Sequence, residues 1–244
     1  MPNSPETPFK PAPALNRLTE RYSHLGSQDL LAVMILSEFP GRIALASSFG
    51  AESAVLLHMI ARINRHIPVL FLDTGKLFGE TLRYRDHLID RLGLTGVVSI
   101  KPDPNLLREA DPAGFLWQNN PDRCCYLRKV LPLERALTGF DAWITGRKRF
   151  QATSRERLPL IEATTTHIKV NPLAGWTQDE TDGYLEAHDL PRHPLVEDGY
   201  LSIGCMPCTG RVAPGADPRS ARWAGLAKTE CGIHLPTMPP GGDD

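Results

Sequence analysis

Short apolar runs alternate with segments of helical spacing along most of the chain. Helical spacing of apolar residues predicts helices at 27–38, 52–64, 80–92, 122–137 and 177–188. The apolar runs at 43–46, 69–72, 96–100 and 142–145 have the length of buried strands. Strands that alternate with helices predict an α/β fold, a doubly wound and mostly parallel sheet with helices on both faces.

The two ends of the chain lack this pattern. Residues 1–13 and 236–244 are polar and rich in proline or glycine, as disordered segments are. We therefore expect a disordered tail over 1–13, a main domain over 14–210 and a mobile C-terminal segment over 211–244. The start lacks the cationic flank and apolar stretch of a secretory signal, and no stretch approaches the roughly 20 apolar residues of a membrane helix. We expect a cytoplasmic protein with no membrane partner.

The charge of the chain is balanced. Its 244 residues include 27 basic and 28 acidic side chains, which give a formal net charge of −1. Bulk electrostatics therefore gives no reason to expect nucleic acid or an anionic membrane as partner. Any site for an anion has to be local.

Two loops at predicted strand ends carry candidate anion-binding chemistry, and ligands of parallel sheets bind at those ends. The serine loop, 47–53, joins a strand to a helix, where backbone N–H groups and serine hydroxyls can hold a phosphate. An ordinary capped turn is the alternative. The arginine loop, 146–157, contains Arg147, Lys148, Arg149, Arg155 and Arg157. Arginine suits phosphate and sulfate oxygens, although a solvated charged loop also explains the run.

Four of the five cysteines form two tight pairs, Cys124 with Cys125 and Cys205 with Cys208. Four thiolates suit zinc or an iron–sulfur cluster, and buried unligated thiols are the remaining alternative. Adjacent cysteines on a helix point about 100° apart, which suits a larger cluster better than a small zinc ion.

The fifth cysteine, Cys231, lies apart from the pairs, between Lys228 and His234. Nearby cations stabilise the thiolate, which is the nucleophilic form of cysteine. The pattern therefore suggests a nucleophile, with an exposed spare thiol as the alternative.

Together these segments resemble the assimilatory adenylyl sulfate reductases, the iron–sulfur branch of the phosphoadenylyl sulfate reductase family. The resemblance runs from about residue 43 to residue 234. It rests on the serine loop, Leu72-Asp73-Thr74-Gly75, Cys124-Cys125 with Lys129, Thr145-Gly146-Arg147, Lys169 to Leu173, Trp176-Thr177, Cys205 to Cys208, and Glu230 to His234. One departure is Arg149-Phe150-Gln151-Ala152, where relatives usually have an acidic residue and a serine.

The resemblance implies a fold, a reaction and a site. The fold is adenine nucleotide alpha hydrolase-like, with the serine loop as a modified pyrophosphate loop. In the reaction, Cys231 attacks the sulfur of adenylyl sulfate, AMP leaves, and thioredoxin or a glutaredoxin-like donor releases sulfite from an S-sulfocysteine, as in assimilatory sulfate reduction. Cys124, Cys125, Cys205 and Cys208 hold one [4Fe-4S] cluster, and Lys129 lies between cluster and substrate. The implied substrate-binding residues are Ser47, Ser48, Phe49, Gly50, Ser53, Thr74, Gly75, Lys129, Gly146, Arg147, Arg155, Arg219, Arg222 and His234.

Three other functions are compatible with these residues. A cluster-bearing reductase could use the 3′-phosphorylated nucleotide, or both nucleotides. The chain could instead be a nucleotide-binding zinc or iron–sulfur module in which Cys231 is inert. It could also be an ATP-using sulfur or adenylyl transferase that shares the pyrophosphate loop.

Overall fold

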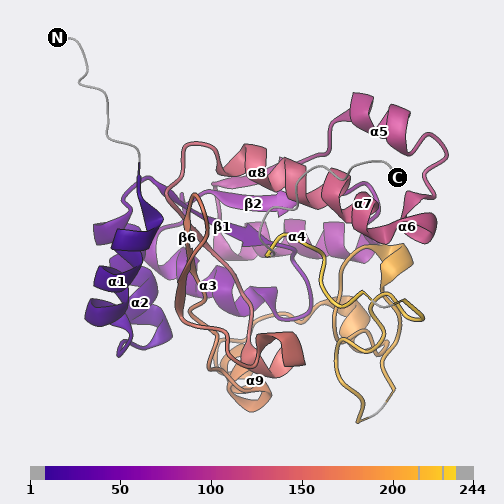
Figure 1. Cartoon of the computed structure of the whole chain (residues 1–244). Coiled ribbons are helices and arrows are strands. Elements are labelled where there is room, and N and C mark those ends of the chain that lie inside the picture. The colour runs from indigo at the N-terminus through magenta and orange to yellow at the C-terminus, as the bar shows by residue number, and fades with distance from the viewer. Residues whose placement is uncertain (1–8, 214, 227, 235–244) are drawn as a thin grey trace.

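The computed structural model describes residues 9–213, 215–226 and 228–234, and a single sheet runs through its centre (Figure 1). The strand order is β3-β2-β1-β4-β6-β5, and all neighbouring pairs are parallel except β5 and β6. The strands are β1 Ile43–Ser47, β2 Val69–Leu72, β3 Val97–Ile100, β4 Ala142–Ile144, β5 Ile161–Ala163 and β6 Ile168–Val170. The predicted mostly parallel sheet and its first four strands are confirmed.

Residues 43–46, 69–72 and 142–144 of strands β1, β2 and β4 are all apolar because both faces of the sheet are covered. Leu45, Val69 and Ile144 point to the larger hydrophobic cluster on one face. Leu70 and Trp143 point to a smaller cluster on the other face. This alternation follows from the two-residue period of a strand, and it gives the continuous apolar runs typical of parallel sheets.

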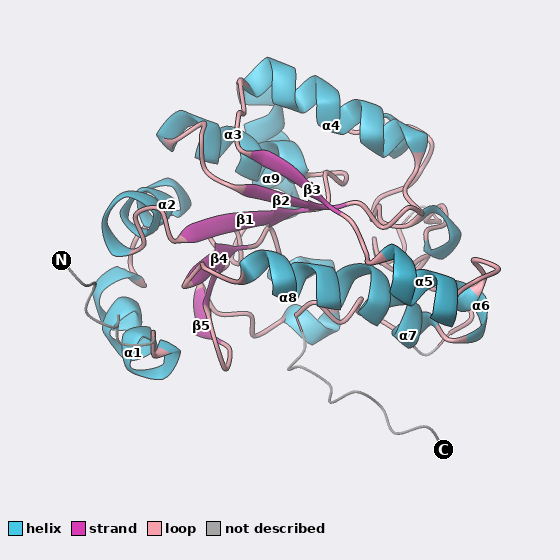
Figure 2. Ribbon diagram, turned by 90° about the horizontal axis from the view of Figure 1, so that it is seen from above, coloured by secondary structure: helices cyan, strands magenta, loops and turns pink. Residues whose placement is uncertain are grey.

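Helices cover both faces of the sheet, as predicted (Figure 2). One face carries α3 Ser53–Ile63, α4 Gly79–Leu92 and α9 Gln178–Ala187. The other carries α5 Pro104–Ala110, α6 Leu116–Asn119, α7 Pro121–Cys125 and α8 Leu131–Leu137. A π-helical turn, Tyr126–Val130, joins α7 to α8, so the predicted helix at 122–137 is confirmed as one run. No helix among the described residues is long and apolar enough to cross a membrane.

The N-terminal prediction needs a correction. Helix α1 begins at Pro11 and ends at Tyr22, and the ring of Phe9 packs edge-on against Phe39 at 5.9 Å. Disorder over 1–13 is therefore wrong for residues 9–13, because proline at the first helical positions is compatible with a helix. Residues 1–8 and 236–244 lie outside the described residues. Helix α2, Ser27–Val33, and a π-helical turn, Met34–Glu38, follow α1.

The part after α9 has little regular structure in the described residues. It contains two 3₁₀ turns, Pro194–Val196 and Met206–Cys208, and two isolated bridges, Leu77 to Cys205 and Thr209 to Arg222. Two more 3₁₀ turns, Arg149–Gln151 and Thr153–Arg155, lie in the arginine loop. In Figure 1 the segment after α9 lies beside α6 and α7.

Candidate functional site

A cavity of about 530 Å³ lies beyond the carboxyl ends of β1, β2 and β4, within the size range of small-molecule sites. The order β3-β2-β1-β4 reverses direction between β1 and β4, and ligands of open α/β sheets bind at such a reversal. Thirteen of the residues implicated by the sequence line this cavity: Ser47, Ser48, Gly50, Ser53, Thr74, Lys129, Gly146, Arg147, Arg155, Arg219, Arg222, Cys231 and His234.

Two further residues implicated by the sequence, Phe49 and Gly75, do not line the cavity. The Phe49 ring is fully buried and packs edge-on against Phe71 at 5.4 Å. Its backbone has φ of 47°, and its N–H donates to Ser47 Oγ over 3.2 Å. Gly75 also has a positive φ, 68°, as the turn after β2 requires. These residues therefore shape the two loops and leave contact with a ligand to their neighbours.

The serine loop presents the open N-terminus of α3 to the cavity. Glu52 occupies the N-cap position without a capping bond from its side chain, and of the first N–H groups only those of Ser53 and Val55 donate to backbone oxygens in the described structure. Free N–H groups at such a helix end attract anions. A Cβ at Gly50 would lie 3.2 Å from the carbonyl oxygen of Ile203, so a side chain there would crowd the opposite wall. The loop has the geometry of an anion cradle.

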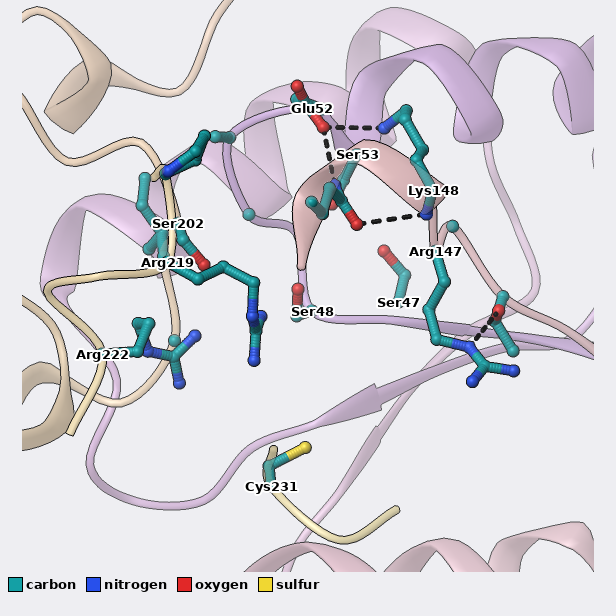
Figure 3. Close-up of a pocket in the computed structure, with 18 of the residues that line it drawn as sticks. Ser47, Ser48, Glu52, Ser53, Arg147, Lys148, Ser202, Arg219, Arg222 and Cys231 are labelled. Atoms are coloured by element: carbon teal, nitrogen blue, oxygen red, sulfur yellow. Dashed lines mark hydrogen bonds and ion pairs between the residues drawn. The ribbon is translucent and has the colours of Figure 1, made fainter. Parts of the chain in front are cut away.

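The arginine loop is tied to the serine loop by a buried ion pair. Lys148 Nζ donates to Glu52 Oε2 over 2.7 Å, and Gln151 Nε2 donates to the same oxygen over 2.9 Å (Figure 3). Arg147 pairs with Glu162 of β5, and burial lowers the pKa of Arg147. The charges of this loop are therefore partly compensated by carboxylates, which the sequence did not indicate.

Cys231 faces the same cavity from the C-terminal side, opposite the serines (Figure 3). The guanidinium of Arg222 lies 4.5 Å from the centre of the Trp223 ring, and Arg222 Nε donates to the Cys208 carbonyl oxygen over 3.0 Å. Arg219 also lines the cavity. Cations around a cysteine stabilise its thiolate and the anionic groups of a ligand. The predicted grouping of Cys231 with arginines is present.

The four paired cysteines line one smaller pocket, the cysteine pocket. Thr74 Oγ1 lies 3.2 Å from Cys205 Sγ, and the bridge between Leu77 and Cys205 brings the second cysteine pair to the end of β2. Burial raises the pKa of the Cys125 thiol to about 12 and also raises that of Cys124. The two pairs, distant in sequence, are therefore brought to one place.

Lys129 and Trp223 line both the cysteine pocket and the cavity. Burial lowers the pKa of Lys129, but the nearby sulfurs, led by Cys205 and Cys231, outweigh it and raise the pKa above its usual value. The Trp223 indole N–H is buried without a hydrogen-bond partner among the described residues. The sequence placed Lys129 between the two sites, and the structure puts it in the wall that separates them.

The cysteine pocket offers the sulfur donors that a metal group would need. No set of three His, Cys, Asp or Glu side chains among the described residues is placed to hold a single metal ion. Four thiols around one pocket, with a half-buried lysine in its wall, match the donor chemistry of an iron–sulfur cluster. The residues present therefore fit such a cluster.

His234 is the last described residue of the C-terminal segment, and it lines the cavity. Its imidazole stacks on the Trp143 ring, with 5.4 Å between the ring centres, and Lys169 Nζ donates to its carbonyl oxygen over 3.2 Å. Burial, reinforced by nearby cations, lowers the pKa of His234 far below 6.5. Nδ1 is buried and has no partner among the described residues. A neutral ring with an unused nitrogen can accept or donate one hydrogen bond to a ligand.

Several cavity residues were not identified as site residues from the sequence. They are Glu52, Lys148, Gln151, Trp223 and Glu230. Glu52, Lys148, Gln151 and Glu230 make ion pairs or hydrogen bonds with other cavity residues. The motifs contain Glu52 and Glu230, but a carboxylate in an anion-binding site is recognisable only once its cationic partner is known.

The chain is similar to proteins of one family over most of its length. The model of the phosphoadenosine phosphosulfate reductase domain matches residues 42–211. The adenosine 5′-phosphosulfate reductase of Mesorhizobium japonicum is 56% identical, over 88% of this chain and 84% of the relative. The protein of the same name from Chelativorans sp. is 52% identical, over 91% of each chain.

Solved structures agree with this similarity. The phosphoadenylyl-sulfate reductase of Candida auris, in complex with phosphate, superposes with a TM-score of 0.69 at 26% identity, covering 86% of this chain and 99% of that one. The FMN adenylyltransferase of Candida glabrata, with a TM-score of 0.55 at 15% identity over 85% of this chain and 78% of its own, shares the fold alone. With its sheet, its serine loop and a domain match over more than half its length, this chain belongs to the phosphoadenosine phosphosulfate reductase domain family.

Proposed function

We propose that this chain catalyses the thioredoxin-dependent reduction of adenylyl sulfate to sulfite and AMP, as part of assimilatory sulfate reduction. The main support for this proposal is that Cys231 lines the same cavity as the serine loop and the cationic side chains of Lys129, Arg219 and Arg222. Relatives that are 56% and 52% identical bear the name adenosine 5′-phosphosulfate reductase. A cytoplasmic setting fits the five free thiols, because reducing compartments keep cysteines unpaired.

In the first step, the Cys231 thiolate attacks the sulfate sulfur of adenylyl sulfate. A sulfur–sulfur bond forms, the bond from sulfur to the bridging oxygen breaks, and AMP leaves with that oxygen. The nucleophile and the substrate are both anionic, so the step depends on preorganised positive charge. Lys129, Arg219 and Arg222 line the cavity with Cys231 and can supply it.

In the second step, a thiolate of reduced thioredoxin attacks the Cys231 sulfur, and sulfite leaves. The mixed disulfide is then resolved by the second thiol of thioredoxin, which restores the Cys231 thiolate. Thioredoxin thereby supplies both electrons, and thiol–disulfide exchange of this kind needs an accessible sulfur. Cys231 is partly exposed.

The proposal assigns the remaining residues to binding. The N-terminus of α3, with Ser47, Ser48 and Ser53, receives the nucleotide phosphate, as helix ends do in other phosphate sites. Cys124, Cys125, Cys205 and Cys208 would hold a [4Fe-4S] cluster, which would act as a structural and electrostatic element beside Lys129. The Lys129 side chain lines both the cavity and the cysteine pocket, so its charge can act on either.

A single-turnover experiment tests the proposal. Pre-reduced, anaerobically purified enzyme mixed with adenylyl sulfate, without thioredoxin, should release one AMP per site and gain one sulfo group on the Cys231 peptide. Cys231→Ser should bind nucleotide but release no AMP, because a hydroxyl is a poor replacement for a thiolate. Thr229→Ala, an exposed neighbour on the same segment, is the matched control. A sulfo group on another cysteine, or normal sulfite release by Cys231→Ser, would refute the mechanism.

The 3′-phosphorylated nucleotide is the second candidate substrate. The structural match to the Candida auris phosphoadenylyl-sulfate reductase favours including it. Turnover of both nucleotides with thioredoxin decides between them: kcat/KM should be higher for adenylyl sulfate. A higher value for the 3′-phosphorylated form would reverse the assignment, and ATP consumption without sulfite would point to a transferase instead.

A further inference from the structure

The carboxylate of Glu230 binds two arginines of the cavity at once. Arg155 grips it with two bonds, Nε to Oε1 over 2.7 Å and Nη2 to Oε2 over 2.9 Å. Arg219 Nη2 lies 3.2 Å from Oε2 and also donates to the Thr229 carbonyl oxygen over 2.7 Å. Parallel arginine–carboxylate bonds of this kind are among the strongest and most directional hydrogen bonds in proteins.

The contact is shielded from solvent. The side chain of Glu230 is 14% exposed, that of Arg155 10% and that of Arg219 15%. Burial raises the pKa of Glu230, but the hydrogen bond and charge of Arg155 outweigh it, so the pKa is lowered overall. A buried ion pair that loses one partner leaves an uncompensated charge, which makes such a contact costly to break.

Glu230 precedes Cys231 directly, in a segment that has no helix or strand of its own among the described residues 228–234. Its side chain reaches back to Arg155, 75 positions earlier in the chain. The described segment is also held by an ion pair from Lys228 to Asp122, by the Arg219 bond to the Thr229 carbonyl oxygen and by a bond from Lys169 to the His234 carbonyl oxygen. Glu230 is therefore the attachment closest to Cys231.

The contact with Glu230 leaves one hydrogen-bond donor of Arg219 without a partner among the described residues. Arg219 Nε is buried and has no hydrogen-bond partner among the described residues, and Arg219 lines the cavity. Glu230 thus fixes the orientation of Arg219 without occupying all of its donors. A preorganised donor needs no rearrangement when an anion arrives.

We propose that Glu230 is a positioning residue, whose carboxylate clamps Arg155 and Arg219 together and docks the Cys231 segment on the cavity. The docking role stands on the contacts alone. Its consequence for turnover rests on the proposed function, because only then is Cys231 the group that must be placed.

Hydrogen exchange tests the docking role without any substrate. Amide exchange of the 228–234 peptide should be faster in Glu230→Gln than in wild type by about tenfold to a hundredfold, the range expected when hydrogen bonds to charged groups are lost. Glu230→Asp, which keeps the charge but shortens the reach, should fall between the two. Glu186→Gln, an exposed carboxylate of α9 outside both pockets, should exchange like wild type.

A double substitution tests the partner. If Arg155 acts on this segment through Glu230, Arg155→Gln should accelerate the same exchange, and adding it to Glu230→Gln should cause little further change. Fully multiplied effects of the two substitutions, or wild-type exchange in Glu230→Gln, would overturn the clamp.

Kinetics then separate positioning from a general structural role. Glu230→Gln should lower kcat for sulfite release more than it weakens AMP binding, and Glu230→Asp should recover part of the loss. Equal losses in kcat and in AMP affinity would refute positioning. If wild type makes no sulfite from adenylyl sulfate, the proposed function fails, while the exchange comparison still decides the docking role.

Discussion

Acid should destabilise the wall of the cavity through His193, whose side chain is fully buried between α4 and the turn Pro194–Val196. The Leu195 N–H donates to His193 Nδ1 over 3.2 Å, so the ring proton sits on Nε2, 3.0 Å from Thr81 Oγ1. Protonation would add a buried charge, whose desolvation outweighs the attraction of Glu80, and would abolish the Leu195 bond. Burial accordingly lowers the pKa of His193 from 6.5 to about 4.

The magnitude follows from these two pKa values. The unfolded chain takes up the proton near pH 6.5 and the folded chain only near pH 4. The contribution of His193 to the free energy of unfolding is therefore complete above pH 6.5, falls as the pH drops, and is lost below pH 4. The difference, 6.5 minus about 4, corresponds to about 3 kcal/mol in total, of which about 2 kcal/mol is already lost at pH 5.

Urea unfolding of wild type and His193→Gln at pH 7 and pH 5 measures this loss. Glutamine keeps one acceptor for Leu195 and one donor for Thr81 but does not titrate. Carboxylates titrate alike in both proteins, so the difference isolates the histidine. Wild type should lose about 2 kcal/mol more than the variant between the two pH values. Equal losses would refute the neutral, buried state of His193.

Three further predictions concern the cations and thiols of the two pockets. Lys129→Ala should keep its iron but turn over about 10²-fold more slowly, because a preorganised charge is lost; Lys101→Ala, exposed outside both pockets, should retain wild-type turnover in the sulfite assay. Cys208→Ser should lose iron after anaerobic purification, whereas full iron content would exclude it as a ligand. Burial lowers the pKa of Lys169 from 10.5 to about 8, so the free energy of unfolding should rise from pH 8 to 10.5 in wild type and not in Lys169→Met.

The fold was predictable where burial dictates the sequence. Strands β2 and β4, and β1 as far as Ala46, are apolar because both sheet faces are covered. Strands β5 and β6 were missed because a charged residue, Glu162 or Lys169, interrupts each short apolar run. Helix α1 was not predicted, and its first residues were taken for a disordered tail because of Pro11 and Pro13, although proline fits the first turn of a helix.

The site was predictable where a residue type carries the chemistry. Serines at a strand end, arginines after β4 and paired cysteines indicate anions and metals by their own donor groups. Glu230 and Trp223 were missed because their roles depend on partners far away in the sequence. Glu230 meets Arg155 across 75 positions, and nothing in a single sequence encodes that meeting.

The bond from Lys148 to Glu52 joins the loops that follow β1 and β4, so two walls of the cavity move as one body. The third wall, residues 201–204, contains no helix or strand among the residues that the structure describes. For inhibitor design, this difference changes the free-energy cost of ordering side chains when a compound binds. A compound that contacts only the joined loops binds a preformed surface, whereas one that reaches toward Cys231 must also order the third wall, at about 0.5–1.5 kcal/mol for each immobilised side chain. Fragments should therefore be sought first at the serine loop and extended afterwards toward the cysteine.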